Sequence, residues 1–211
     1  MLKSASTFWS AAILLGAFAG FGNPAPLAWA AWLVPCAGWH MGARGALVRP
    51  LGGVFVALGV LCGMCTLGLY GPGEAALAWV ALGGLLTITY GMAKRFRGAN
   101  SALSDAALLG VFGLVLTLLP TGGGLLVGGW AKHSPQAAGF VMDVSPAVFV
   151  VEAAGVDLLR LPLFYESDTT DFIMGTRRPW NTPLAPIVLL VVGCALALLP
   201  SKPRPSISQL Q

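Results

Sequence analysis

Few side chains in this sequence could carry out acid–base chemistry, and several of them lie in one stretch, residues 143–165. There Asp143, Glu152, Asp157 and Arg160 interrupt an otherwise apolar run. Glu152 and Asp157 could act as a pair of acids, but no base or nucleophile can be assigned beside them. We therefore predict no catalytic residue in this chain, and we expect any specific function to involve this stretch.

The cysteines and histidines do not form a recognisable metal or redox site. Cys62 and Cys65 make a C-x-x-C pair on one face of a predicted helix. A structural metal site takes about four ligands, and His40 and His133 are predicted to lie on opposite sides of a membrane. We predict no metal and no cofactor, and we interpret the cysteines as small buried residues. His40 is interpreted as an interfacial side chain.

The composition points to a lipid environment. Hydrophobic residues make up 56% of the chain and charged residues only 9%, whereas soluble domains are roughly a quarter charged. The mean hydropathy is +0.80. A soluble protein of this composition would expose apolar surface and aggregate. The net charge of +4 is explained by orientation in a membrane, so no nucleic-acid partner is expected.

Six apolar segments are candidate membrane spans, which need about 20 residues each, although the second of them is short. The expected fold is all-α, with one transmembrane domain over residues 1–200 and a disordered cytoplasmic tail over residues 201–211. The predicted spans are residues 4–22, 27–41, 51–70, 75–92, 102 to 119 or 130, and 183–199.

The charges predict the orientation of these spans. With the N-terminus in the cytoplasm, eight of the twelve basic residues and one acid, Asp105, lie inside. This distribution follows the positive-inside rule and predicts that both termini are cytoplasmic, in the inner membrane of a bacterium. Lys3, the first apolar run and Ala28-Trp29-Ala30 also fit a signal peptide with its cleavage site. Apolar sequence continues through Ala31 to Pro35, which favours a span instead.

The longest connection, an external segment at about residues 130–182, is predicted to contain a short helix. Ser145 suits an N-cap and Pro146 suits the first helical position. The predicted helix runs to Arg160, where Asp157 and Arg160 could pair. Its roughly fifteen residues span only about 22 Å, so it cannot cross and return. We expect a re-entrant or interfacial helix, which could form a gate with Ser145, Pro146, Glu152, Asp157 and Arg160 or simply cap the bundle.

Two basic clusters are predicted on the cytoplasmic side. One is the loop with Arg44 and Arg49, and the other is the run Lys94, Arg95 and Arg97. Such clusters can contact anionic lipid or a cytoplasmic partner. They can equally be plain determinants of topology.

Residues of the second half resemble a known family. SPAVFVVEAAGVDLLR (residues 145–160) and LLTITYGMAKRFRGANSALSDAALLGVFGLVL, within residues 75–200, resemble permease subunits of ABC-2-type transporters. The resemblance implies six spans, a re-entrant external helix, a separate cytoplasmic ATPase subunit, and a second permease copy or a related permease. The loop between the second and third spans is shorter than the coupling segment of that family.

The first half has a different likeness. LLGAFAGFGNPAPLAWAAWLVPC, within residues 8–70, is similar to the opening spans of apolipoprotein N-acyltransferases, whose catalytic domain has no counterpart here. The leading hypothesis is therefore a transporter subunit that moves a hydrophobic or amphipathic substrate. The alternatives are a non-catalytic scaffold or assembly subunit of a membrane complex, and a lipid-modifying membrane enzyme.

Overall fold

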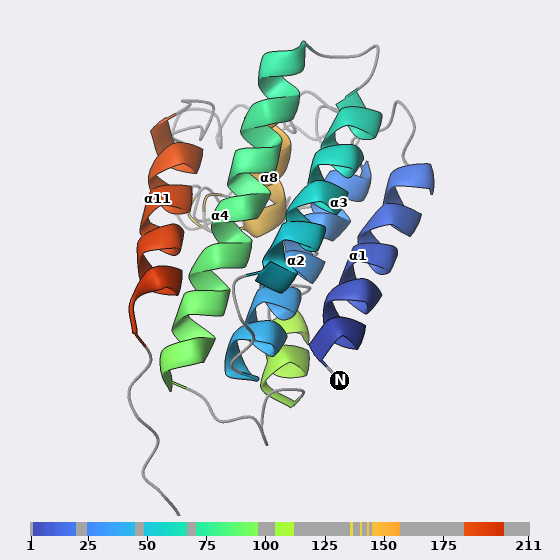
Figure 1. Ribbon diagram of the computed structural model, residues 1–211. Coiled ribbons are helices and arrows are strands. Elements are labelled where there is room, and N and C mark those ends of the chain that lie inside the picture. The colour runs from blue at the N-terminus through green and yellow to red at the C-terminus, as the bar shows by residue number, and fades with distance from the viewer. Residues whose placement is uncertain are drawn as a thin grey trace, which may run out of the picture.

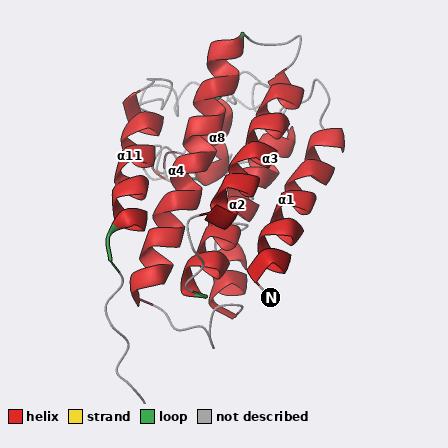
Figure 2. Ribbon diagram, viewed as in Figure 1, coloured by secondary structure: helices red, strands yellow, loops and turns green. Residues whose placement is uncertain are grey.

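The described part of the chain is entirely helical and contains no strand (Figure 2). The computed structural model describes residues 2–19, 25–44, 49–66, 71–96, 104–111, 136, 140, 143, 145–156 and 184–200, without the side chains of residues 2–4, 18, 19, 49 and 50. The all-α prediction is confirmed for these residues. The expected tail over residues 201–211 lies outside them.

The helices follow the predicted segments closely. They are α1 (Leu2–Ala19), α2 (Ala25–Ala43), α3 (Arg49–Thr66), α4 (Pro72–Phe96), α8 (Pro146–Ala153) and α11 (Leu184–Leu198), and residues 104–111 form a further helix. Several boundaries differ from the prediction, two of them at basic residues. Arg49 begins α3 instead of lying in a loop, and α4 continues to Phe96, so Lys94 and Arg95 occupy its last turn.

The long helices run side by side; α1 to α4 alternate in direction, and α11 runs in the same direction as α4 (Figure 1). Helices α3 and α4 are antiparallel, since Phe55 and Gly59 of α3 meet Gly83 and Trp79 of α4, which is the reverse order along α4. Helices α2 and α4 are parallel to each other. Gly38 and Gly42 of α2 meet Leu86 and Tyr90 of α4 in the same order along both helices.

Helix α4 is the centre of the bundle, because it packs against α2, α3, α8 and α11. Its large buried side chains are Leu82, Leu86 and Tyr90. Small residues let its neighbours approach the backbone closely. A Cβ atom on Gly91 would lie 2.9 Å from the carbonyl carbon of Leu196 in α11. A Cβ atom on Gly42 of α2 would lie 2.9 Å from the carbonyl carbon of Tyr90.

Helix lengths do not match the six-span prediction fully. Among the described helices, α4, with 25 residues, is the one long and apolar enough to cross a bilayer by itself. Shorter apolar helices are residues Ala5–Ala17, Leu51–Thr66 and Leu184–Leu198. Six spans are therefore not supported by the lengths of the described helices.

Candidate functional site

Helix α8 carries the polar residues that the sequence singled out, and it lies inside the bundle. It packs against α2 and α4. Figure 1 shows it behind α4, in the half of the bundle away from the N-terminus. From Ala147 to Ala153 every residue is buried. An interfacial helix would keep one face polar and exposed, so that alternative does not fit the described residues of this segment.

The N-terminus of α8 was predicted correctly. Ser145 has extended backbone angles at the N-cap, and Pro146 opens the helix. The N–H of Phe149 bonds to the carbonyl of Ser145 at 3.0 Å. The Ser145 side chain does not cap the helix, however, and its Oγ is fully buried with no hydrogen-bond partner among the described residues. An unpartnered buried hydroxyl is unfavourable by about 1–3 kcal/mol.

The predicted C-terminus of this helix was wrong. The helix ends at Ala153, not Arg160, because the chain turns at Gly155, whose φ is 78°. The N–H of Gly155 bonds to the carbonyl of Glu152, and the N–H of Val156 bonds to the carbonyl of Val151. These two bonds form a Schellman cap, in which glycine takes the left-handed position. Asp157 and Arg160 lie outside the described residues.

Glu152 is the buried acid of this site. Glu152 is only 6% exposed, and the other residues of α8 are apolar. Charged side chains are rarely buried unless they interact with another group, and Glu152 does have such an interaction. The site thus combines a buried carboxylate, a buried serine hydroxyl and one short helix against α2 and α4. Among the described residues no base is hydrogen-bonded to the Ser145 hydroxyl, so the described groups do not form a nucleophile with its base.

The basic residues predicted to contact a partner gather at the opposite end of the bundle. Arg44 follows α2 and is exposed, while Lys94 and Arg95 lie in the last turn of α4 (Figure 1). The Nζ of Lys94 donates to the carbonyls of Ala197 at 3.1 Å and Leu199 at 3.4 Å. Lys94 therefore caps the C-terminus of α11. The side chain of Arg49 and all of Arg97 lie outside the described part.

Two contacts of α2 were missed by sequence reasoning. Nε1 of Trp9 in α1 donates to Nδ1 of His40 at 3.2 Å, and His40 is 9% exposed. Trp32 donates its indole N–H to the carbonyl of Gly110. No sequence spacing links these residues, because each pair joins separate helices. The prediction that Cys62 and Cys65 are buried is confirmed.

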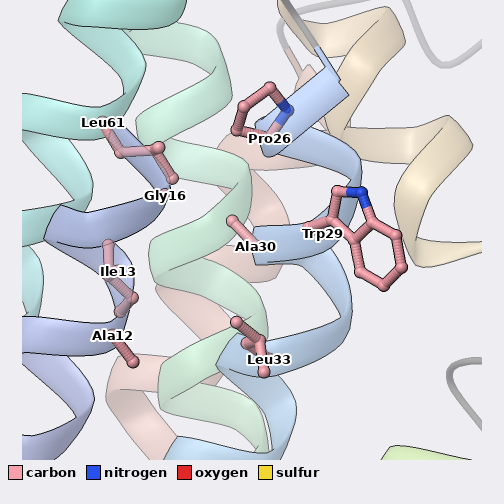
Figure 3. A pocket seen from close by; sticks show the side chains of 8 residues that line it. All are labelled: Ala12, Ile13, Gly16, Pro26, Trp29, Ala30, Leu33 and Leu61. Carbon is pink, nitrogen blue, oxygen red and sulfur yellow. The ribbon is translucent and has the colours of Figure 1, made fainter. Parts of the chain in front are cut away.

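A separate groove between α1 and α2 has a volume of about 140 Å³ (Figure 3). Ile13 and Gly16 line one side, Trp29 and Leu33 line the other, and Leu61 of α3 also contributes. Its lining contains no ionisable side chain. The groove can hold an apolar group but cannot perform acid–base chemistry.

Comparison with known proteins identified no relative. No protein-family model, no curated protein and no solved structure matches the chain.

Proposed function

We propose that this chain is a membrane-spanning subunit of a transporter, built as a six-span bundle with both termini in the cytoplasm. Its outer surface supports placement in lipid. Large apolar side chains are exposed on several helices, including Phe8, Leu15, Val56, Leu108 and Val191 at 62–71% exposure. The described charged residues lie at or beyond helix ends, except Glu152, which is buried. Such an outer surface is unfavourable in water and favourable in a bilayer.

The hydroxyl groups of α4 also suit a lipid environment. Thr87 bonds to the carbonyl of Gly83 at 2.9 Å, and Thr89 bonds to that of Leu85 at 2.8 Å. Each hydroxyl thereby finds an acceptor within its own helix and needs no water. Close contacts at small residues, such as Gly42 against Tyr90, are common where membrane helices associate.

Alternating helix directions support the proposed orientation. The end of α2 that precedes Arg44 and the end of α4 that carries Lys94 and Arg95 lie at the same end of the bundle (Figure 1). Positive residues favour the cytoplasmic side of a membrane. Helix α8 lies toward the opposite half of the bundle, which corresponds to the external side.

The observation that carries the transport proposal is the burial of Glu152 on a short helix inside the bundle. An ionisable residue inside a membrane protein usually marks a functional site. We propose that α8 forms part of the outer gate, with Ser145 and Glu152 contacting the polar part of an amphipathic substrate and Pro146 fixing the start of the helix. Asp157 and Arg160 follow it in sequence and remain part of this proposal.

The proposed complex includes a cytoplasmic ATPase subunit and a second permease, as the ABC-2 resemblance implies. The basic end, with Arg44, Arg49, Lys94, Arg95 and Arg97, is the surface we assign to that ATPase or to anionic lipid. A scaffold subunit is the second candidate, since the exposed apolar side chains of α11, such as Leu184 and Val191, could cover a partner helix. No described feature favours the lipid-modifying enzyme.

Purification of the protein in a mild detergent tests the proposal. A nucleotide-hydrolysing subunit should copurify with it, and the complex should hydrolyse ATP. Glu152→Gln should lower the ATPase turnover of the complex roughly tenfold, as expected for loss of a hydrogen bond to a charged group. Glu74→Gln, at the start of α4, is the matched control and should retain full turnover.

Two results would oppose the proposal. Recovery of structural or biosynthetic proteins without any ATPase would favour the scaffold. Equal turnover of the Glu152→Gln and wild-type complexes, at equal amounts in the membrane, would remove Glu152 from the gate.

A further inference from the structure

The groove between α1 and α2 has a buried floor and an open side. Ile13, Ala30 and Leu61 line the floor, and each is at most 3% exposed. Gly16 and Leu33 line the rim and are partly exposed. The groove therefore opens on the outer surface of the bundle, and an occupant can enter it from there.

Small residues of α1 leave this space. Ala12 and Gly16 lie one turn apart on the same face of the helix. A Cβ atom on Gly16 would lie 3.9 Å from Cδ1 of Leu61, which is an ordinary van der Waals distance. Helix α1 also packs more extensively against α3 than against α2. The described side chains thus leave a groove of about 140 Å³ between α1 and α2.

The lining of the groove favours an apolar occupant over water. Apart from the indole of Trp29, the side chains that line it are aliphatic. A bound water needs two to four polar partners, and apolar cavities of about 150 Å³ in proteins stay dry and bind small hydrocarbons. A hydrocarbon group therefore suits this groove better than water does.

The shape of the groove favours a chain over a helix. Gly16 and Pro26 lie at one end, and Ala12 and Leu33 lie at the other (Figure 3). From Pro26 to Leu33 the groove follows α2 for about 10 Å along its axis. A helix is itself about 10 Å wide, and a stable protein interface buries about 1,000 Å² or more. A groove of about 140 Å³ is too small for either, whereas an unbranched hydrocarbon chain can lie along it.

We propose that this groove binds one acyl chain of a phospholipid in the outer leaflet. Gly16 lies near the end of α1 and Pro26 near the start of α2, in the half of the bundle away from Lys94 and Arg95. In the membrane orientation proposed above, on which the choice of leaflet rests, acyl chains run alongside these helices. Binding of the chain depends neither on α8 nor on an ATPase partner.

Native mass spectrometry of the full-length protein, in a neutral detergent with short alkyl chains, tests this site. The probes are phosphatidylcholine, phosphatidylglycerol and glycerophosphocholine, which has a headgroup but no acyl chain. We expect one preferred phospholipid per chain, with similar affinity for the two headgroups, because no ionisable side chain lines the groove. Glycerophosphocholine should not bind. Bound phospholipid should also raise the temperature of thermal unfolding, since it binds the folded protein.

A larger side chain in the groove should displace the lipid. Ala12→Leu fills the end beside Leu33, and the affinity for phospholipid should fall roughly tenfold, which corresponds to lost contact with about two methylene groups. Ala11→Leu is the matched control, because Ala11 is exposed on the same helix and does not line the groove. It should bind phospholipid as tightly as the wild type.

A second variant fills the opposite end. Gly16→Leu should weaken phospholipid binding as Ala12→Leu does, and without lipid it should unfold at no lower temperature than the wild type, because the groove has room for its side chain. Gly52→Leu in α3 is its control, since Gly52 is exposed and no atom lies within 4 Å of an added Cβ. Gly52→Leu should keep full phospholipid affinity.

Four results would overturn the proposal. The first is equal phospholipid binding in Ala12→Leu, Gly16→Leu and their controls. The second is binding of glycerophosphocholine, which would indicate a headgroup site. The third is a dimer without bound lipid that Ala12→Leu disrupts, which would assign the groove to a second copy. The fourth is a lower unfolding temperature of both filling variants without lipid, which would indicate that the chain already fills the groove.

Failure of this site can be distinguished from failure of the proposed function. Absence of a copurifying ATPase would count against the transport proposal and would leave the lipid groove standing. Loss of the lipid site, with an ATPase still bound, would count against the groove alone.

Discussion

Glycine residues set the distance between α2 and α4, so single methyl groups should affect stability. A Cβ atom on Gly42 would lie 2.9 Å from the carbonyl carbon and 3.0 Å from Cα of Tyr90. These are backbone atoms and cannot rotate away. The two helices must separate to accommodate a side chain, which reduces the packing of Leu86 and Tyr90.

We predict that Gly42→Ala lowers the free energy of unfolding by about 1–3 kcal/mol, the usual effect of overpacking. Gly63→Ala in α3 is the matched control, because no atom lies within 4 Å of its added Cβ. It should leave stability unchanged or raise it by up to about 1 kcal/mol through helix propensity. Thermal unfolding in detergent measures both. Similar losses in the two variants would contradict the close contact at Gly42.

At the scale of elements, Lys94 joins the ends of α4 and α11. Its ammonium group bonds to the carbonyls of Ala197 and Leu199, which lie at the C-terminus of α11. Terminal carbonyls of a helix lack partners within the helix, and a cation also interacts favourably with that end. A residue of one helix thus stabilises the end of another.

We predict that Lys94→Met lowers the free energy of unfolding by about 1 kcal/mol and increases hydrogen exchange in the last turn of α11. Lys94→Arg should largely restore protection, because it keeps a donor with a positive charge. Arg95→Met is the control, since no described residue accepts a hydrogen bond from its Nε. If hydrogen exchange at the end of α11 increased as much in Arg95→Met as in Lys94→Met, the capping role of Lys94 would be wrong.

Helix positions could be predicted from sequence better than helix ends. Apolar runs bounded by Pro, Gly and basic residues identified the long helices to within a few residues, because burial and helix formation both need those runs. The end of α8 was missed. Gly155 follows two alanines within an apolar run, and its left-handed cap is fixed by bonds to Val151 and Glu152. The signal was the Gly itself, a common residue after a helix end.

Tertiary contacts of the candidate site could not be predicted. Sequence reasoning identified Ser145 and Glu152 as unusual and placed them on a re-entrant or interfacial helix, without deciding between the two. Their burial depends on packing of α8 against α2 and α4, which no local pattern encodes. The bond between Trp9 and His40 joins residues 31 positions apart. Asp157, Arg160 and Arg97 were chosen from sequence alone and remain predictions.

At the scale of the whole molecule, the exposed apolar faces and the position of the charges make one consistent arrangement. The outer faces of α1, α3 and α11 carry large apolar side chains, while Arg44, Lys94 and Arg95 lie at one end. In water this surface would promote association, whereas a bilayer covers it. The arrangement accounts for a chain that has 9% charged residues but forms a regular bundle.

The orientation of α4 tests the central claim, a membrane-spanning bundle with its basic end in the cytoplasm. Reporter fusions would be made after Gly73, at the start of α4, and after Phe96, at its end, with alkaline phosphatase and green fluorescent protein. We predict phosphatase activity only after Gly73 and fluorescence only after Phe96. Cytoplasmic signals at both positions, or a soluble protein in both fusions, would contradict the account.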